Sequence, residues 1–271
     1  MMEGRLIRAR RGGSRRGESL IVREDDAVDS VGFDFAILRL GAGERREERH
    51  DKESVWILLG GEATLTFAGE AHHVHRASLF DELPTALSLC AKTALTIDSR
   101  DESEWAVVRA ANERAFAPRL FLPEALAPER RGQGLAQEMC VRDVRLVFDW
   151  NERPESKLVV GEVVSYPGRW SSYPPHHHAQ PELYHYRFTE PQGYGHAELD
   201  EHVVKVGPGD TLKIMGGETH AQVSAPGYGM YYLWIVKHLP DRPYRGFEFT
   251  PEHRWLLDPK NQGWRPARGD G

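Results

Sequence analysis

The chain has 271 residues, a net charge of −6 and 28% charged residues, which is the composition of a globular protein. The acidic balance argues against nucleic acid as a partner, because phosphate recognition needs a basic face. No apolar run approaches the roughly 18 residues needed to cross a bilayer, so no membrane partner is expected. Two cysteines, Cys90 and Cys140, are too few for a disulfide framework, and the basic N-terminal stretch lacks an apolar h-region, so no secretory signal is expected. These features predict a cytoplasmic protein.

Short runs rich in Val, Ile, Tyr, Trp and Phe alternate with Gly and Pro along the chain, a pattern typical of all-β folds. The first half contains VGFDFAILRL, SVWILLGGEATLTF, ALSLCAKTALTI and EWAVVRA. After a proline-rich connector at about 115–136, the second half contains VRLVFDW, KLVVGEVVSY, PELYHYRF, HVVKV, DTLKIM, HAQVSA and MYYLWIVKH.

Each half also carries a glycine pair that predicts a hairpin, Gly60-Gly61 in the first and Gly207-Pro208-Gly209 in the second. Two similar strand sets indicate a bicupin, with two double-stranded β-helix (jelly-roll) barrels. We expect an N-terminal barrel over residues 1–120 and a C-terminal barrel over residues 121–271. Exposed sheet edges are commonly covered by a partner subunit, so a homo-oligomer is expected.

The segment SSYPPHHHAQPELYHYRF, residues 171–188, carries a histidine cluster. The prolines enforce an extended backbone, and alternate residues of a strand share a face. His176 and His178 should therefore point together, while His177 points away. After the turn at 179–181, Glu182 begins a strand whose inner face also carries Tyr184, Tyr186 and Phe188, with His185 and Arg187 on the other face.

A fourth ligand is expected from GDTLKIMGGETH, in which His220 opens another strand and Gln222 shares its face. Three imidazoles and a carboxylate form a mixed nitrogen and oxygen set. We predict that His176, His178, Glu182 and His220 bind one divalent metal ion in the second barrel. Zn²⁺ is the preferred ion, with Fe²⁺, Mn²⁺ and Ni²⁺ as alternatives.

The first half contains a second H-x-H pair, His73 and His75, next to His72. No glutamate follows at three or four residues, and no later G-x-x-H completes the pattern. These are predicted to be surface or hairpin histidines, and the first barrel is expected to be metal-free.

Several segments resemble the 5-deoxy-glucuronate isomerases of myo-inositol catabolism and, less closely, the 4-deoxy-5-ketouronate isomerases of pectin breakdown. The similarity is dense over about 158–258, and the string WSSYPPHxH is specific. One departure is the short connection at 179–181, where the family has a longer, acidic insert, so the pocket rim should differ. The matching segments are GEVVSYPGRWSSYPPHHH, PELYHYRF, EPQGYG, APGYGMYYLWIV and PEHRWLLDP.

The resemblance implies a metal-dependent aldose–ketose isomerase acting on a deoxyuronic acid, a small sugar acid. Under this hypothesis, candidate wall or proton-relay residues are Tyr184, Tyr186, Gln222 and Tyr232. Candidates for binding the substrate carboxylate are Arg169, Arg187 and Lys213. Two alternatives stay open: a cupin dioxygenase with Fe or Cu, and a non-enzymatic sugar-binding cupin.

Overall fold

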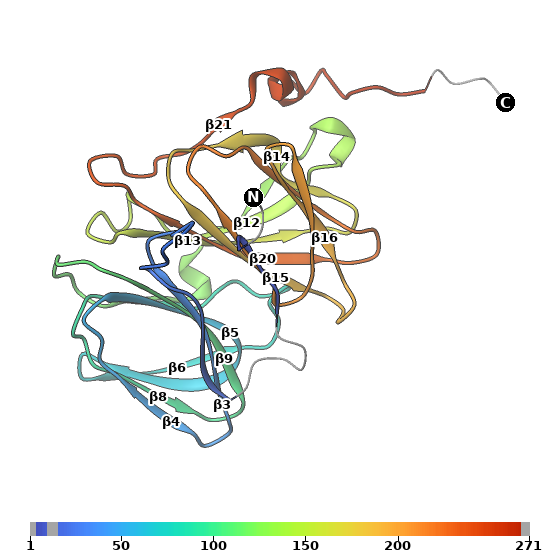
Figure 1. Cartoon of the computed structure of the whole chain (residues 1–271). Helices are drawn as coiled ribbons and strands as arrows, with labels where there is room; N and C mark the ends of the chain where they lie inside the picture. Colours follow the sequence, from blue (N-terminus) through green and yellow to red (C-terminus); the bar gives the residue numbers. More distant parts are fainter. Residues whose placement is uncertain (1–3, 10–15, 267–271) are drawn as a thin grey trace.

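A computed structural model describes residues 4–9 and 16–266 and shows two β lobes lying against each other (Figure 1). The predicted all-β class is confirmed, since the described helices are only three short 3₁₀ segments. They are η1 (Pro123–Ala125), η2 (Ala136–Glu138) and η3 (Pro251–Leu257). Within the described residues, no helix is long and apolar enough to span a membrane.

The N-terminal lobe is built around strands in the order β10-β7-β5-β9-β3-β2, with β6 and β8 pairing with β5 and β4 pairing with β8. All these pairs are antiparallel. The strands are β2 (Gly17–Val22), β3 (Asp34–Leu40), β4 (Arg45–Glu48), β5 (Glu53–Phe67), β6 (Glu70–Arg76), β7 (Ala86–Leu89), β8 (Leu95–Ser99), β9 (Ser103–Ala110) and β10 (Arg119–Phe121).

The C-terminal lobe has two sheets, ordered β1-β18-β15-β20-β13-β12-β11 and β17-β16-β19-β14-β21. Every strand predicted in this half is present. The strands of the first sheet are β1 (Leu6–Ile7), β11 (Glu129–Arg131), β12 (Arg142–Phe148), β13 (Leu158–Ser165), β15 (Glu182–Phe188), β18 (Thr211–Ile214) and β20 (Met230–Lys237). Those of the second sheet are β14 (Trp170–His177), β16 (Gly195–Leu199), β17 (His202–Val206), β19 (His220–Ser224) and β21 (Glu248–Phe249).

Three apolar cores follow from the strand alternation. One fills the N-terminal lobe around Trp56 and Trp105, and one fills the C-terminal lobe around Tyr186. The third joins the lobes and includes Phe35 and Leu183. Strand β15 contributes side chains to the cores on both sides of its sheet, because its odd and even residues point in opposite directions. The predicted parity of this strand is confirmed.

Neither predicted glycine hairpin forms. Gly60-Gly61 lies inside β5, which continues for 15 residues and passes from one set of partners to another. Gly61 adopts φ +100°, and a Cβ there would overlap the carbonyl oxygen of Glu102. The pair therefore bends a long strand rather than ending it. Gly207-Pro208-Gly209 does turn the chain, but it joins β17 and β18, which belong to different sheets.

The division of the chain into lobes at residues 1–120 and 121–271 stays a prediction. Two strand pairings involve residues near the ends of the predicted N-terminal lobe. Strand β10 pairs with β7 and extends the N-terminal lobe to Phe121. Strand β1 pairs with β18, so Leu6 and Ile7 join a sheet of the C-terminal lobe. The first described strand of the sequence therefore belongs to the C-terminal lobe.

Candidate metal centre

The four predicted ligands come from neighbouring strands of the C-terminal lobe. His176 is in β14 and lies opposite His220 of β19 in the strand register. His178 follows β14, and Glu182 is the first residue of β15. All four side chains are buried, whereas His177 is partly exposed, as the alternation predicts. Two sheets thus meet where the four groups gather.

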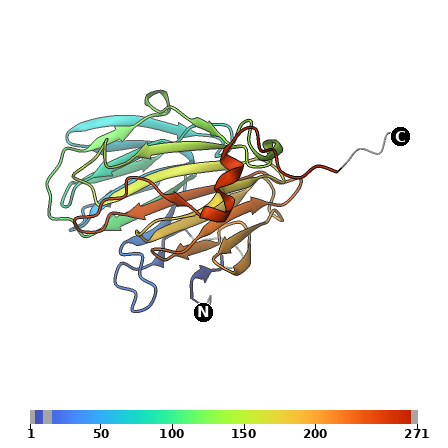
Figure 2. The same cartoon turned by 90° about the horizontal axis from the view of Figure 1, so that it is seen from above.

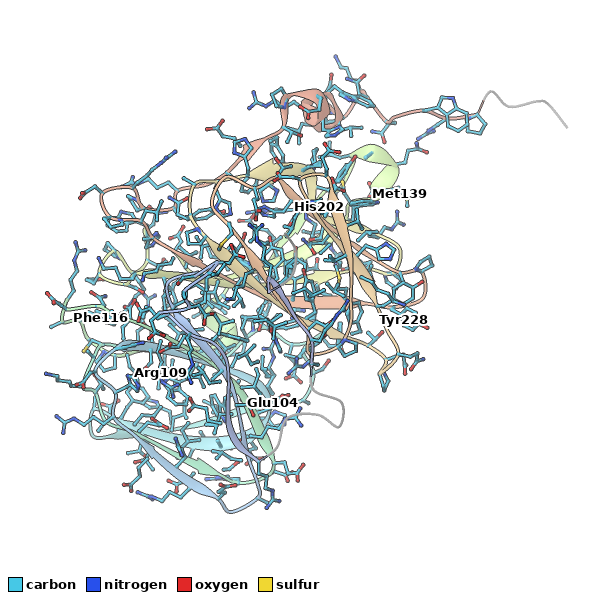
Figure 3. The ribbon with its side chains drawn as sticks, viewed as in Figure 1. Glu104, Arg109, Phe116, Met139, His202 and Tyr228 are labelled. Carbon is cyan, nitrogen blue, oxygen red and sulfur yellow. The ribbon has the colours of Figure 1, made fainter. Side chains whose placement is uncertain are left out.

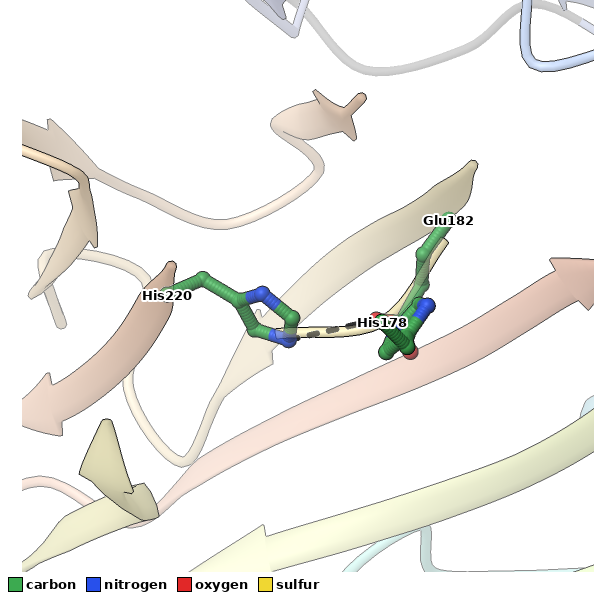
Figure 4. A group of neighbouring side chains, drawn as sticks. All are labelled: His178, Glu182 and His220. Carbon is green, nitrogen blue, oxygen red and sulfur yellow. Dashed lines mark hydrogen bonds and ion pairs between the residues drawn. The ribbon is translucent and has the colours of Figure 1, made fainter. Parts of the chain in front are cut away.

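The ligand atoms of His178, Glu182 and His220 all lie within 4.8 Å of one another (Figure 4). Nε2 of His178 lies 3.1 Å from Oε2 of Glu182, and Nε2 of His220 lies 3.4 Å from the same oxygen. His176 stands beside this group, with its ring centroid 4.4 Å from that of His220 and 6.5 Å from that of His178. This geometry suits a metal ion held by His178, Glu182 and His220.

The hydrogen bonds around His220 fit a cation at this position. Nδ1 of His220 lies 3.1 Å from the carbonyl oxygen of Glu218, which can only accept, so Nδ1 carries the proton. The lone pair of Nε2 then faces a carboxylate oxygen of Glu182, and buried Nε2 makes no hydrogen bond. Nδ1 of His176 makes the same kind of contact with Ser172 O at 3.1 Å. Metal-binding histidines are usually oriented in this way.

The electrostatics also keep the site in the form that binds a metal. Burial by itself raises the pKa of Glu182, but hydrogen bonds from His178 and His220 bring it down to about 2, and a bound cation in place of those ring protons would act in the same direction. Burial, reinforced by the nearby His220 ring, lowers the pKa of His176 well below its ordinary value. At neutral pH Glu182 is therefore a carboxylate and His176 a neutral imidazole, as metal ligation requires.

A cavity of about 430 Å³ opens onto this cluster. Tyr184 and Tyr232 form part of its wall together with Ser171 and Ser172. Tyr232 Oη lies 2.5 Å from Ser171 Oγ and 3.2 Å from Ser172 Oγ, which in turn lies 3.2 Å from Tyr184 Oη. The four hydroxyl groups make one connected chain beside Glu182.

The KduI/IolB family profile matches residues 6–256 of the sequence. The chain belongs to this family. It is 30% identical to the 5-deoxy-glucuronate isomerase of Geobacillus kaustophilus, over 89% of this chain and 90% of that protein. The corresponding protein of Bacillus subtilis is 26% identical, over 85% and 89%. The resemblance seen in the sequence is thereby confirmed.

Solved structures support the same fold. An IolB-like protein from Salmonella typhimurium superposes with a TM-score of 0.80 at 24% identity, covering 90% of this chain and 97% of that one. Lactobacillus farciminis oxalate decarboxylase has a TM-score of 0.66 at 13% identity, covering 90% and 86%. A cupin barrel protein from Leptotrichia buccalis is also similar, with a TM-score of 0.51 at 13% identity over 83% and 91%. The bicupin architecture is therefore established.

In this KduI/IolB family member, two of the four predicted wall residues lie away from the cavity. Tyr186 and Gln222 are fully buried, and Tyr186 Oη donates a 2.6 Å hydrogen bond to Gln222 Oε1. Tyr184 and Tyr232 do line the cavity. The catalytic role of all four stays a prediction, and the geometry supports it for Tyr184 and Tyr232.

The three predicted carboxylate-binding residues are engaged elsewhere. Arg187 pairs at 2.9 Å with Glu104 of the N-terminal lobe, whose position is labelled in Figure 3. Lys213 pairs with Asp26 at 2.6 Å. Arg169 donates to the carbonyl oxygen of Glu138. None of the three lines the cavity, so their position gives the predicted role no support. The arginines that line it, which sequence reasoning missed, are Arg131, Arg142 and Arg245.

The C-terminal segment at 244–249 also contributes to the site, which the sequence did not indicate. Strand β21 pairs with β14, and the red segment crosses the strands of the C-terminal lobe in Figure 2. The Phe247 ring lies 4.1 Å from that of His176, and the Tyr244 ring lies 4.9 Å from that of His178. These two aromatic rings shield the histidines on one side.

The histidines of the first half lie where the sequence placed them. His72, His73 and His75 are on β6, in the hairpin with β5. His72 stacks on Phe67 at 4.8 Å, and His73 lies 3.5 Å from Glu62. They are hairpin histidines on the surface of the N-terminal lobe.

Proposed function

We propose that this chain is a metal-dependent aldose–ketose isomerase that converts 5-deoxy-glucuronate into 5-dehydro-2-deoxy-gluconate in inositol catabolism. The buried group of His178, Glu182 and His220, placed at a cavity with two tyrosines, carries the proposal. Two Geobacillus relatives are named as 5-deoxy-glucuronate isomerases, which supports the same activity. His176 is proposed as the fourth ligand, and Zn²⁺ as the preferred ion.

The reaction needs one proton to leave the carbon that bears the hydroxyl group and another to reach the neighbouring carbonyl carbon, through an enediol. No oxidant or reductant is consumed. A divalent ion held by His178, Glu182 and His220 would supply Lewis-acid chemistry, an effect worth several kcal/mol. General acid–base groups contribute about 10²–10⁴-fold more.

The hydroxyl chain of Ser171, Tyr232, Ser172 and Tyr184 can exchange protons with the substrate oxygens. Burial raises the pKa of Tyr184 well above its ordinary value, and the Glu182 charge raises it further. Burial also raises the pKa of Tyr232. Both phenols are therefore protonated at neutral pH and act as donors that orient and stabilise the oxygen atoms on which charge develops.

The test is proton NMR of the purified protein with 5-deoxy-glucuronate in D₂O without oxygen, before and after treatment with a chelator. We expect conversion to the ketose with deuterium at the former carbonyl carbon, loss of conversion after chelation, and recovery on adding Zn²⁺. Metal content is measured in parallel. No conversion by the metal-loaded protein contradicts the activity, and full conversion by verified metal-free protein contradicts the metal requirement. Turnover that consumes oxygen indicates the dioxygenase alternative instead.

A further inference from the structure

The strand β12 brings a charged residue to the inner wall of the cavity. Arg142, Val144 and Leu146 alternate along this strand, and all three line the cavity. The Arg142 side chain is buried, since the residue is only 7% exposed. A guanidinium group thus lies in the same cavity wall as Glu182 of the metal centre.

Arg142 has no carboxylate partner among the residues that the structure describes. Its Nη1 donates a 2.8 Å hydrogen bond to the carbonyl oxygen of Cys140, and no other hydrogen bond of this side chain is formed there. Burial lowers the pKa of its guanidinium group, as expected for a cation without a counter-ion. A buried charge of this kind is costly unless an opposite charge accompanies it.

Other buried arginines show how unusual this placement is. Arg76 makes a bidentate ion pair with Glu162, and Arg109 makes one with Glu18. Arg153 also lacks a carboxylate, but its guanidinium lies over the Phe116 ring and it does not line the cavity. Arg142 differs from Arg76, Arg109 and Arg153 because it has no carboxylate partner among the described residues and lines the cavity that is also lined by Glu182.

The rest of the cavity favours an anion as well. Arg131, which also pairs with Glu129, and Arg245 line it, so the lining contains three arginines and two carboxylates, Glu182 and Asp149. Asp149 already accepts hydrogen bonds from the backbone and side chain of Asn151. Glu182 belongs to the metal centre. The cavity volume of about 430 Å³ is in the usual range for a small-molecule site.

We propose that Arg142 binds the carboxylate of the sugar acid and makes the enzyme select acids over neutral sugars. The proposal rests on the proposed function. A guanidinium offers two parallel N–H donors that match a carboxylate, and the low dielectric of a buried site strengthens the pair. The opposite end of the substrate then lies toward Glu182 and the neighbouring histidines. Arg142 thus acts as a specificity-determining residue.

The first experiment needs no variant. Binding of gluconate, an open-chain six-carbon sugar acid, is compared by calorimetry with binding of gluconamide, its uncharged amide, to the metal-loaded protein. We expect gluconate to bind on the order of 10- to 100-fold more tightly, the range for a hydrogen-bonded charged group. Equal affinities overturn the proposal, and they do so whether or not the protein turns over 5-deoxy-glucuronate.

The second experiment compares Arg142→Met and Arg142→Lys with Arg130→Met. Arg130 is on the neighbouring strand β11, is half exposed, pairs with Asp143 and does not line the cavity. For Arg142→Met we expect gluconate binding to fall to the level of gluconamide, with unchanged metal content and gluconamide binding. Arg142→Lys should recover part of the preference, and Arg130→Met should keep all of it.

Kinetics on 5-deoxy-glucuronate separate this proposal from the proposed function. We expect Arg142→Met to raise KM on the order of 10- to 100-fold. Isomerisation with wild-type KM in Arg142→Met overturns the role of Arg142 and leaves the isomerase intact. Equal losses of gluconate and gluconamide binding also overturn it, since they indicate a structural role. Loss of gluconate preference in a protein that never isomerises 5-deoxy-glucuronate leaves Arg142 as an acid-binding residue and contradicts only the isomerase.

Discussion

At the scale of single residues, the contrast between His177 and His178 tests the metal centre most directly. His178 lies 3.1 Å from Glu182, while His177 alternates to the other side of the strand. We predict that His178→Ala folds but retains far less than one metal ion per chain, because one of few ligands is lost. His177→Ala should keep its metal. Elemental analysis after gel filtration measures both, and equal losses in the two variants would rule out this ligand assignment.

His238 gives a pH dependence that is separate from the metal ligands. Its Nδ1 accepts a hydrogen bond from Tyr244 N at 2.9 Å, and its buried Nε2 has no partner. Burial lowers its pKa to about 4, from an ordinary value of 6.5. Between these values the unfolded chain binds a proton that the folded chain does not, so stability falls as the pH decreases from 6.5 toward 4.

We therefore predict that His238→Gln loses less thermal stability between pH 7 and pH 5 than the wild type. The substitution removes the titrating group, and comparing each protein with itself at the two pH values cancels any pH-independent cost of changing the hydrogen bond from Tyr244 N. His202→Gln serves as the control at an exposed histidine. The melting temperature at both pH values is the measurement, and parallel curves for wild type and His238→Gln would refute this account.

At the scale of the elements, the pairing of β13 with β20 shapes the cavity. Gly161 lies opposite Trp234, and a Cβ at position 161 would overlap the indole ring. Trp234 lines the cavity. The glycine therefore leaves room for the indole beside β13, where a larger residue would push it toward the cavity.

We predict that Gly161→Ala raises KM for the sugar acid and destabilises the fold by about 1–3 kcal/mol, the usual cost of overpacking. Trp234→Phe in the same chain should restore part of the affinity, because a smaller ring clears the new methyl group. Gly207→Ala is the matched control, since its added Cβ meets only Asp210 Oδ2 at 3.8 Å. Steady-state kinetics and denaturant unfolding provide both readouts; a Gly161→Ala protein with wild-type KM would exclude the steric role.

At the scale of the whole molecule, a buried ion pair joins the two lobes. Arg76 of β6 donates to both carboxylate oxygens of Glu162 in β13, at 2.7 and 2.8 Å, and Tyr231 Oη donates to the same carboxylate at 2.7 Å. Arg76 and Glu162 are 1% and 0% exposed, so water cannot replace a lost partner. The pair fixes how the sheets of the two lobes face each other across their shared apolar core.

We predict that Glu162→Gln lowers the free energy of unfolding by about 3–5 kcal/mol, because it leaves the Arg76 charge buried without a counter-ion. Glu152→Gln, which breaks the exposed pair with Arg119, should cost less than about 1 kcal/mol. Urea unfolding of both variants makes the comparison. Similar small effects would show that the lobes do not depend on this pair.

The local pattern of the sequence was enough for the features that depend on strand alternation. The all-β class, the strands of the second half, and the inward faces of His176, His178, Tyr184 and Tyr186 follow from a period of two residues. The family segments also pointed to the candidate metal centre and to the isomerase relatives. Each of these features depends on residues that are close together in the sequence, so no distant contact is needed to infer it.

Tertiary structure alone decided the features that depend on partners far away in the chain. Arg187 and Lys213 meet Glu104 and Asp26 of the other lobe, more than eighty residues away in each case. Strand β12 is buried on both faces, so alternation could not tell that Arg142 faces the cavity. Gly61 bends β5 because Glu102 lies against it. Burial and charge pairing arise from long-range packing, and a sequence pattern reports only which residues share a face.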